Sequence, residues 1–166
     1  PNVGYIRGST GETGRVETFV VGRTPFGYRG GTFGTDPVFM RGYPRGVIGP
    51  LNRTRGGNLQ PQGGQVMNKY TSEFRWKAVE SRQLQARPYV FLDAANAWNS
   101  LNAYTPNDLY RSAGVGVKLF LPIVGMIEFN YGYNFESYRS LETSNIESPG
   151  WSFQFSLGQG FGGGGR

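Results

Sequence analysis

From residue 67 onward, apolar and polar side chains alternate along the chain, and a period of two is typical of half-exposed β-strands. The alternation predicts five strands, at about 70–78, 85–98, 109–121, 127–135 and 151–161. Glu73 falls on the polar face of the first strand, and Asp93 falls on the polar face of the second. Because an antiparallel pair joined by a tight turn aligns its residues, the two carboxylates can lie at a similar height.

The connections between the predicted strands alternate in length. Short turns at 80–82 and 122–125 are interleaved with long polar loops at 99–108 and 137–149. Short turns at one end and long loops at the other are characteristic of outer-membrane barrels. Aromatic residues near the strand ends are then expected at the two membrane interfaces: Trp98, Tyr110, Tyr133 and Trp151 at the outer one, Phe120 and Phe161 at the inner one.

The N-terminal part is less regular. Residues 1–14 predict a strand end and a turn, and residues 15–22 predict a short strand, which brings the count to about six strands. Single-chain barrels begin at eight strands, so we expect an all-β, antiparallel chain that is part of a larger barrel. A soluble antiparallel sandwich that buries the apolar face is the alternative. Gly and Ser beside charged residues on the polar face favour a lumen wall.

Residues 23–66 are rich in Gly, Pro, Arg and Asn, and contain one short apolar piece that leads into Arg41. A structureless loop of this length is unusual in a compact domain, so the segment is either functional or a flexible linker. Its aromatic side chains favour a functional loop, because flexible linkers rarely carry so many. These aromatics are Phe26, Tyr28, Phe33, Phe39 and Tyr43.

Composition narrows the classes of function. The chain of 166 residues has no cysteine and no histidine, so disulfides, thiol nucleophiles, imidazole bases and the usual zinc ligands are excluded. We therefore expect no enzyme activity, no catalytic residue, no metal and no cofactor. The net charge of +6 arises from scattered Lys and Arg, which does not favour nucleic-acid binding. No apolar run reaches the roughly 18 residues of a membrane helix, and no signal-peptide pattern opens the sequence.

Four motifs resemble the BamA-type outer-membrane insertases, and the similarity extends from about residue 35 to 161. They look like that family's sixth outer loop, its thirteenth and fourteenth strands and its closing strand. In order, they are Met40-Arg41-Gly42-Tyr43 with Ile48-Gly49-Pro50, Phe91-Leu92-Asp93 with Ala97-Trp98, residues 110–122, and residues 153–161. Asn68-Lys69-Tyr70 and residues 111–122 look most like members from the Bacteroidota.

The resemblance implies the C-terminal portion of a 16-stranded transmembrane β-barrel, inside the range of about 8 to 26 strands of such barrels. Residues 1–166 would belong to one barrel domain, with a long outer loop at 23–66 folded into the lumen, the last five strands at 67–161 and a tail at 162–166. The family also places periplasmic POTRA domains and about ten more strands before this region.

The resemblance further implies that Arg41, Gly42 and Tyr43 hold the loop inside the barrel, with the guanidinium of Arg41 meeting Glu73 and Asp93. A planar guanidinium fork suits a pair of carboxylates. Arg41→Ala is then expected to leave both carboxylates unpaired and to release the loop. The alternative is that Arg41 is a solvated loop charge.

The same resemblance implies a role in folding and inserting β-barrel proteins into the outer membrane of Gram-negative bacteria. Incoming strands would add at a lateral gate beside the closing strand, by β-augmentation. The closing-strand residues implied are Phe153, Phe155, Gly158, Gly160 and Phe161, with Gly158 at an inward kink. The alternative is that the two glycines only allow close packing.

The partners implied are client barrel proteins, lipoprotein subunits and outer-membrane lipid, including lipopolysaccharide. Sister transporters of the TamA type or two-partner secretion pores share the loop motif and stay open as alternatives. A passive porin and a soluble carbohydrate- or nucleic-acid-binding sheet are the remaining ones.

Overall fold

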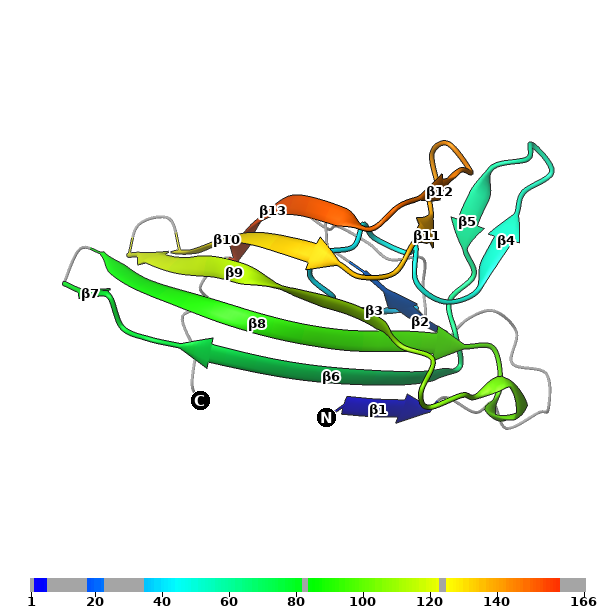
Figure 1. Cartoon of the computed structure of the whole chain (residues 1–166), viewed down its shortest axis with the longest axis horizontal. Coiled ribbons are helices and arrows are strands. Elements are labelled where there is room, and N and C mark those ends of the chain that lie inside the picture. The colour runs from blue at the N-terminus through cyan, green and yellow to red at the C-terminus, as the bar shows by residue number, and fades with distance from the viewer. Residues whose placement is uncertain (1, 6–17, 23–34, 82–83, 123–124, 159–166) are drawn as a thin grey trace, which may run out of the picture.

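In the computed structural model, the described residues are 2–5, 18–22, 35–81, 84–122 and 125–158. One bent antiparallel sheet dominates them (Figure 1). Its strands, in spatial order, are β1 (Asn2–Tyr5), β6 (Val66–Arg75), β8 (Gln85–Trp98), β9 (Tyr110–Leu121), β10 (Gly125–Asn134) and β13 (Gly150–Gly158), with β7 (Val79–Glu80) also paired to β8. The predicted all-β, antiparallel fold class is confirmed.

The long strands have the lengths that a membrane crossing needs. From β6 to β13 they contain 9 to 14 residues, against about 9–11 for a tilted transmembrane strand. Their tight turns lie at one end of the sheet and their long connections at the other (Figure 1). We call the end with the long connections the long-loop end. No helix among the described residues is long and apolar enough to cross a membrane.

The first predicted strand, 70–78, is interrupted in the structure. β6 ends at Arg75 and β7 begins at Val79, although the N–H groups of Trp76 and Ala78 still donate to carbonyls of β8. The pairing shifts by one residue between Arg75, opposite Tyr89, and Val79, opposite Ala86. This bulge lies beside Pro88, which has no N–H to donate to the ladder.

The large sheet takes its N-terminal strand from residues 2–5 and not from the strand expected at 15–22. Residues 2–5, read as part of a strand end and a turn, form β1 and pair with β6. Of the strand expected at 15–22, the described part contains β2 (Thr18–Val21), which pairs in parallel with β3 (Thr35–Val38) and is not part of the large sheet. Four-residue strands carry too short a pattern for their partners to be read from the sequence.

Three further short elements lie at the long-loop end (Figure 1). They are the hairpin of β4 (Leu51–Arg53) and β5 (Leu59–Pro61), the hairpin of β11 (Tyr138–Arg139) and β12 (Ile146–Glu147), and the 3-10 helix η1 (Leu101–Ala103). The segment 23–66 therefore contains β3, β4 and β5, which the sequence did not predict.

The hydrophobic core lies between this segment and the sheet. Val21, Met40 and Tyr43 are fully buried there against Ala95 and Ala97 of β8. We call the face of the sheet that the loop covers the inward face, and the opposite one the outward face. Glu73 and Asp93 point inward and contact Arg41 of the loop, so the loop packs on the polar face.

Two of the aromatic residues expected at the outer membrane interface pack against loop residues instead. Trp98 is 7% exposed and packs edge-on against Tyr104 at 4.9 Å. Tyr110 packs against Tyr43 of the loop. Tyr133 and Trp151 do lie on the outward face, in contact with one another at 5.3 Å. Trp98 and Tyr110 were misassigned because two different loops, through Tyr104 and Tyr43, provide aromatic surface that alternation within the strands does not reveal.

Candidate functional site

Arg41 follows β3 and lies in a turn pressed against the inward face of the sheet. The residues on either side fix its position, because Met40 is 1% exposed and Tyr43 is fully buried. The N–H of Met40 donates to the carbonyl of Gly22 at 3.3 Å, which ties the turn to the end of β2. From this turn, the guanidinium of Arg41 extends to the inward face of the sheet.

The guanidinium of Arg41 contacts both predicted carboxylates. Its Nε and Nη2 donate to the two oxygens of Asp93 at 2.7 and 2.8 Å, and its Nη1 pairs with Glu73. Asp93 lies opposite Thr71 in the β6–β8 ladder, so Glu73 is its diagonal neighbour on the same face. The fork therefore bridges two strands, as planar donors permit.

Burial and aromatic rings strengthen this arrangement. The side chains of Arg41 and Asp93 are 14% and 1% exposed, and the Phe91 ring lies 4.0 Å from the guanidinium carbon. Burial alone would lower the pKa of Arg41, but hydrogen bonds and charge from Asp93, and then from Glu73, raise it above its usual value. The arginine is thus held charged in a partly desolvated site.

Glu73 has two more cationic partners, which the sequence reasoning missed. Arg75 pairs with it, and Lys118 of β9 donates to it at 3.0 Å. The expectation that loss of Arg41 would leave both carboxylates unpaired is therefore wrong for Glu73. Asp93, in contrast, has its ion pair among the described residues with Arg41. Removal of Arg41 therefore leaves this carboxylate without that partner.

Lys118 extends the network to a fourth strand. It lies directly opposite Glu128 of β10, with Nζ and Oε1 3.9 Å apart, and the Tyr89 hydroxyl donates to the same carboxylate at 2.5 Å. Charges of opposite sign on the polar faces of adjacent strands were the available signal in the sequence. The sequence alone does not show that β9 and β10 pair in the register that puts Lys118 opposite Glu128.

The backbone of the motif is bound as tightly as its side chains. Ser112 of β9 donates to the Arg41 carbonyl at 2.6 Å, and Gln154 of β13 donates to the Tyr43 carbonyl at 3.1 Å. Between them, Gly42 lies so close to Gly132 of β10 that a Cβ on Gly132 would be 3.2 Å from the Gly42 Cα. Three consecutive loop residues therefore contact three strands.

Tyr43 makes a second anchor, at the long-loop end of the wall. Its hydroxyl lies 2.9 Å from the Glu136 carboxylate and 3.0 Å from the Arg111 carbonyl, and it accepts a hydrogen bond from the N–H of Glu136 at 3.1 Å. Burial, followed by the charge of Glu136, raises the pKa of the phenol above its usual value. Glu136 follows β10 in an irregular connection, where periodicity gives no signal.

The closing-strand residues are placed only in part. Phe153 and Phe155 of β13 lie on the outward face near Phe129, at ring distances of 6.2 and 5.1 Å. Gly158 ends β13 opposite Met126 in a regular ladder, so its kink stays a prediction. Gly160 and Phe161 lie outside the described residues. No group of His, Cys, Asp and Glu among the described residues could hold a metal ion.

Comparison with known proteins gives one match. The model of the Omp85 superfamily domain matches residues 3–161. No curated protein and no solved structure matches the chain.

Proposed function

Because the chain belongs to the Omp85 superfamily, a family of outer-membrane β-barrel insertases and transporters, we propose that it is the C-terminal barrel part of a BamA-type insertase. In this role it folds client β-barrel proteins into the outer membrane of a Gram-negative bacterium, without enzyme chemistry. Lipoprotein subunits and POTRA domains complete the machinery. The Bacteroidota are the proposed lineage, and lipopolysaccharide is the proposed outer-leaflet lipid.

The observation that carries this proposal is the docked turn at residues 41–43. Its charged side chain binds β6 and β8, and its backbone binds β9 and β13. A loop held at so many points fixes the relative positions of the wall strands. We call the turn at residues 41–43 the clamp. A passive pore does not need a clamp, and a loop bound on the inward face would narrow its lumen.

In this proposal, client strands enter beside β13, the closing strand of the barrel. β13 is the last strand in the spatial order, with β10 as its one neighbour among the described strands. An edge strand with unpaired backbone groups accepts another strand through main-chain hydrogen bonds. In the proposed mechanism, a client strand adds at this edge, and the clamp holds the strands behind it.

Reconstitution tests the proposal. The full-length polypeptide and its accessory subunits are placed in liposomes, and folding of a labelled client barrel is followed by its heat-modifiable migration in gels. We expect clients to fold faster than in empty liposomes, and Arg41→Ala to slow them. Arg53→Ala is the matched control, because Arg53 is an exposed arginine on β4.

Two outcomes would overturn the proposal. One is a client folding rate equal to that of empty liposomes. The other is passage of a soluble passenger protein across the membrane with no client insertion, which would identify a sister transporter.

A further inference from the structure

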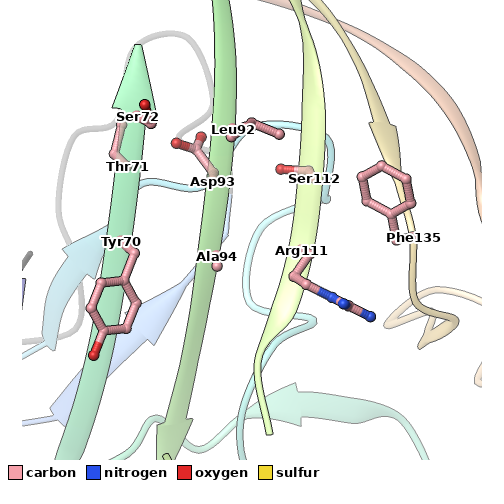
Figure 2. Close-up of a pocket in the computed structure, with 9 residues that line it drawn as sticks. All are labelled: Tyr70, Thr71, Ser72, Leu92, Asp93, Ala94, Arg111, Ser112 and Phe135. Atoms are coloured by element: carbon pink, nitrogen blue, oxygen red, sulfur yellow. The ribbon is translucent and has the colours of Figure 1, made fainter. Parts of the chain in front are cut away.

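A groove of about 540 Å³ lies on the outward face, near the long-loop end (Figure 2). The outward-pointing side chains that line it come from four neighbouring segments of the wall. They are Tyr70 and Ser72 of β6, Leu92 and Ala94 of β8, Arg111 of β9, and Phe135, just after β10. Asp93 and Ser112, which contact Arg41 on the inward face, also line the groove, so the groove and the site around Arg41 share these two positions of the sheet.

The register of the sheet explains why a hollow forms here. Tyr70 lies opposite Ala94, and Ala94 lies opposite Arg111, so three strands place these side chains in one row. Phe135 continues the row, since its N–H donates to the Arg111 carbonyl at 3.1 Å. The methyl group of Ala94 thus lies between Tyr70 on one side and Arg111 and Phe135 on the other. The small side chain forms the floor of the groove.

The groove has a charged end and an apolar end. Ser72 and Leu92 form the next row of the ladder, two residues away from the long-loop end. Arg111 lies at the start of β9, directly after a long connection, where headgroups meet the wall of a barrel. A long basic side chain at this depth extends its charge to the headgroups while its stem covers apolar surface.

Arg111 has capacity for another anion. Its side chain is 68% exposed, and its Nε pairs with Glu136 at 2.6 Å, the one ion pair recorded for it among the described residues. A guanidinium has five N–H donors, so one carboxylate at Nε leaves its outer edge available. Planar recognition of phosphate is a characteristic use of arginine.

We propose that this groove binds an anionic membrane lipid with a phosphate headgroup. One acyl chain lies over Ala94 and Leu92 between Tyr70 and the Arg111–Phe135 side, and the phosphate binds the outer edge of the Arg111 guanidinium. The inference rests on the proposed function insofar as that function places the outward face in a bilayer. Charge favours this occupant over a client barrel strand, whose lipid-facing side chains are apolar.

Native mass spectrometry of the full-length polypeptide tests the proposal. The protein is equilibrated in detergent with equal amounts of dioleoyl phosphatidylglycerol and dioleoyl phosphatidylcholine. We expect preferential retention of phosphatidylglycerol, lowered about fivefold by Arg111→Gln and less by Arg111→Lys, since a charge-assisted hydrogen bond is lost. Arg53→Gln, at an exposed arginine of β4, is expected to change nothing.

A second variant separates the groove from the ion pair. Ala94→Phe fills the floor but leaves Arg111 and Glu136 in place, and it is expected to lower retention of phosphatidylglycerol as well. Equal retention in the wild type and in both variants would overturn the proposal. So would photo-crosslinks from position 70 to a client barrel together with unchanged lipid retention. Because retention is measured in detergent, its result does not depend on whether the protein inserts clients.

Discussion

The side-chain amide of Gln154 donates a hydrogen bond to the backbone carbonyl of Tyr43 at 3.1 Å. Gln154 is 5% exposed and lies in the middle of β13, and Tyr43 is fully buried in the loop. The bond therefore joins the clamp at residues 41–43 to the strand at the edge of the sheet. Loop docking and ordering of the edge strand are coupled through it.

Gln154→Leu is expected to make both the loop around Tyr43 and strand β13 more mobile. The substitution keeps an apolar side chain of similar size, but leaves a buried carbonyl unsatisfied, which costs about 1–3 kcal/mol. Hydrogen exchange followed by mass spectrometry should show faster exchange in residues 40–48 and in 150–158. Gln60→Leu, at an exposed glutamine of β5, is the control. Faster exchange confined to β13 would contradict the coupling.

Arg41→Ala is expected to release the loop by leaving Asp93 buried without its ion-pair partner. Removal of one partner of a buried pair costs about 3–5 kcal/mol. Glu73 keeps Lys118 and Arg75, so the penalty comes mainly from Asp93. Limited proteolysis of the loop measures the release.

Asp93→Asn in the Arg41→Ala background provides the internal test of this reasoning. Neutralising the unpaired carboxylate should restore part of the protection of the loop. If the double variant is cleaved as fast as Arg41→Ala alone, Asp93 is not the source of the penalty.

Tyr43→Phe is expected to weaken docking at neutral pH and to change its dependence on alkaline pH. Burial raises the pKa of Tyr43 above its ordinary value of 10.0, so its contribution to stability is complete below pH 10.0 and is lost as the pH rises toward the native pKa. The melting temperature should therefore fall less steeply above pH 10 in Tyr43→Phe than in the wild type. Tyr131→Phe, on the outward face, should follow the wild type.

The sequence predicted the wall because strand side chains repeat with a period of two. That period placed Glu73 and Asp93 on the same polar face without any knowledge of the fold, and the structure brings Arg41 to both. Lys118 of β9 and Glu128 of β10 also lie on polar faces, directly opposite one another. Their direct opposition depends on the register set by the turn at 122–125, which alternation within each strand does not specify.

The contacts of the loop were the least predictable part of the site. Tyr43 reaches Glu136, 93 residues later in the chain, in a connection without periodicity. The partner of β2 was unpredictable for a related reason. A four-residue apolar strand pairs with whichever edge the tertiary structure offers, here the parallel β3.

Gly42→Ala is expected to disturb docking through a contact with the wall as well as through backbone strain. Gly42 has φ +84°, and a Cβ there would lie 2.9 Å from the Cβ of Ser112. Gly57 also has φ +84°, but a Cβ would meet nothing within 4 Å, so Gly57→Ala carries the dihedral strain of about 1–2 kcal/mol alone. The free energy of unfolding should fall further in Gly42→Ala than in Gly57→Ala, because Ser112 must move and its hydrogen bond to the Arg41 carbonyl stretches. If the free energy of unfolding falls equally in the two variants, the sheet accommodates the added methyl group at Gly42 without cost. The close approach of Gly42 to Ser112 would then not hold the loop.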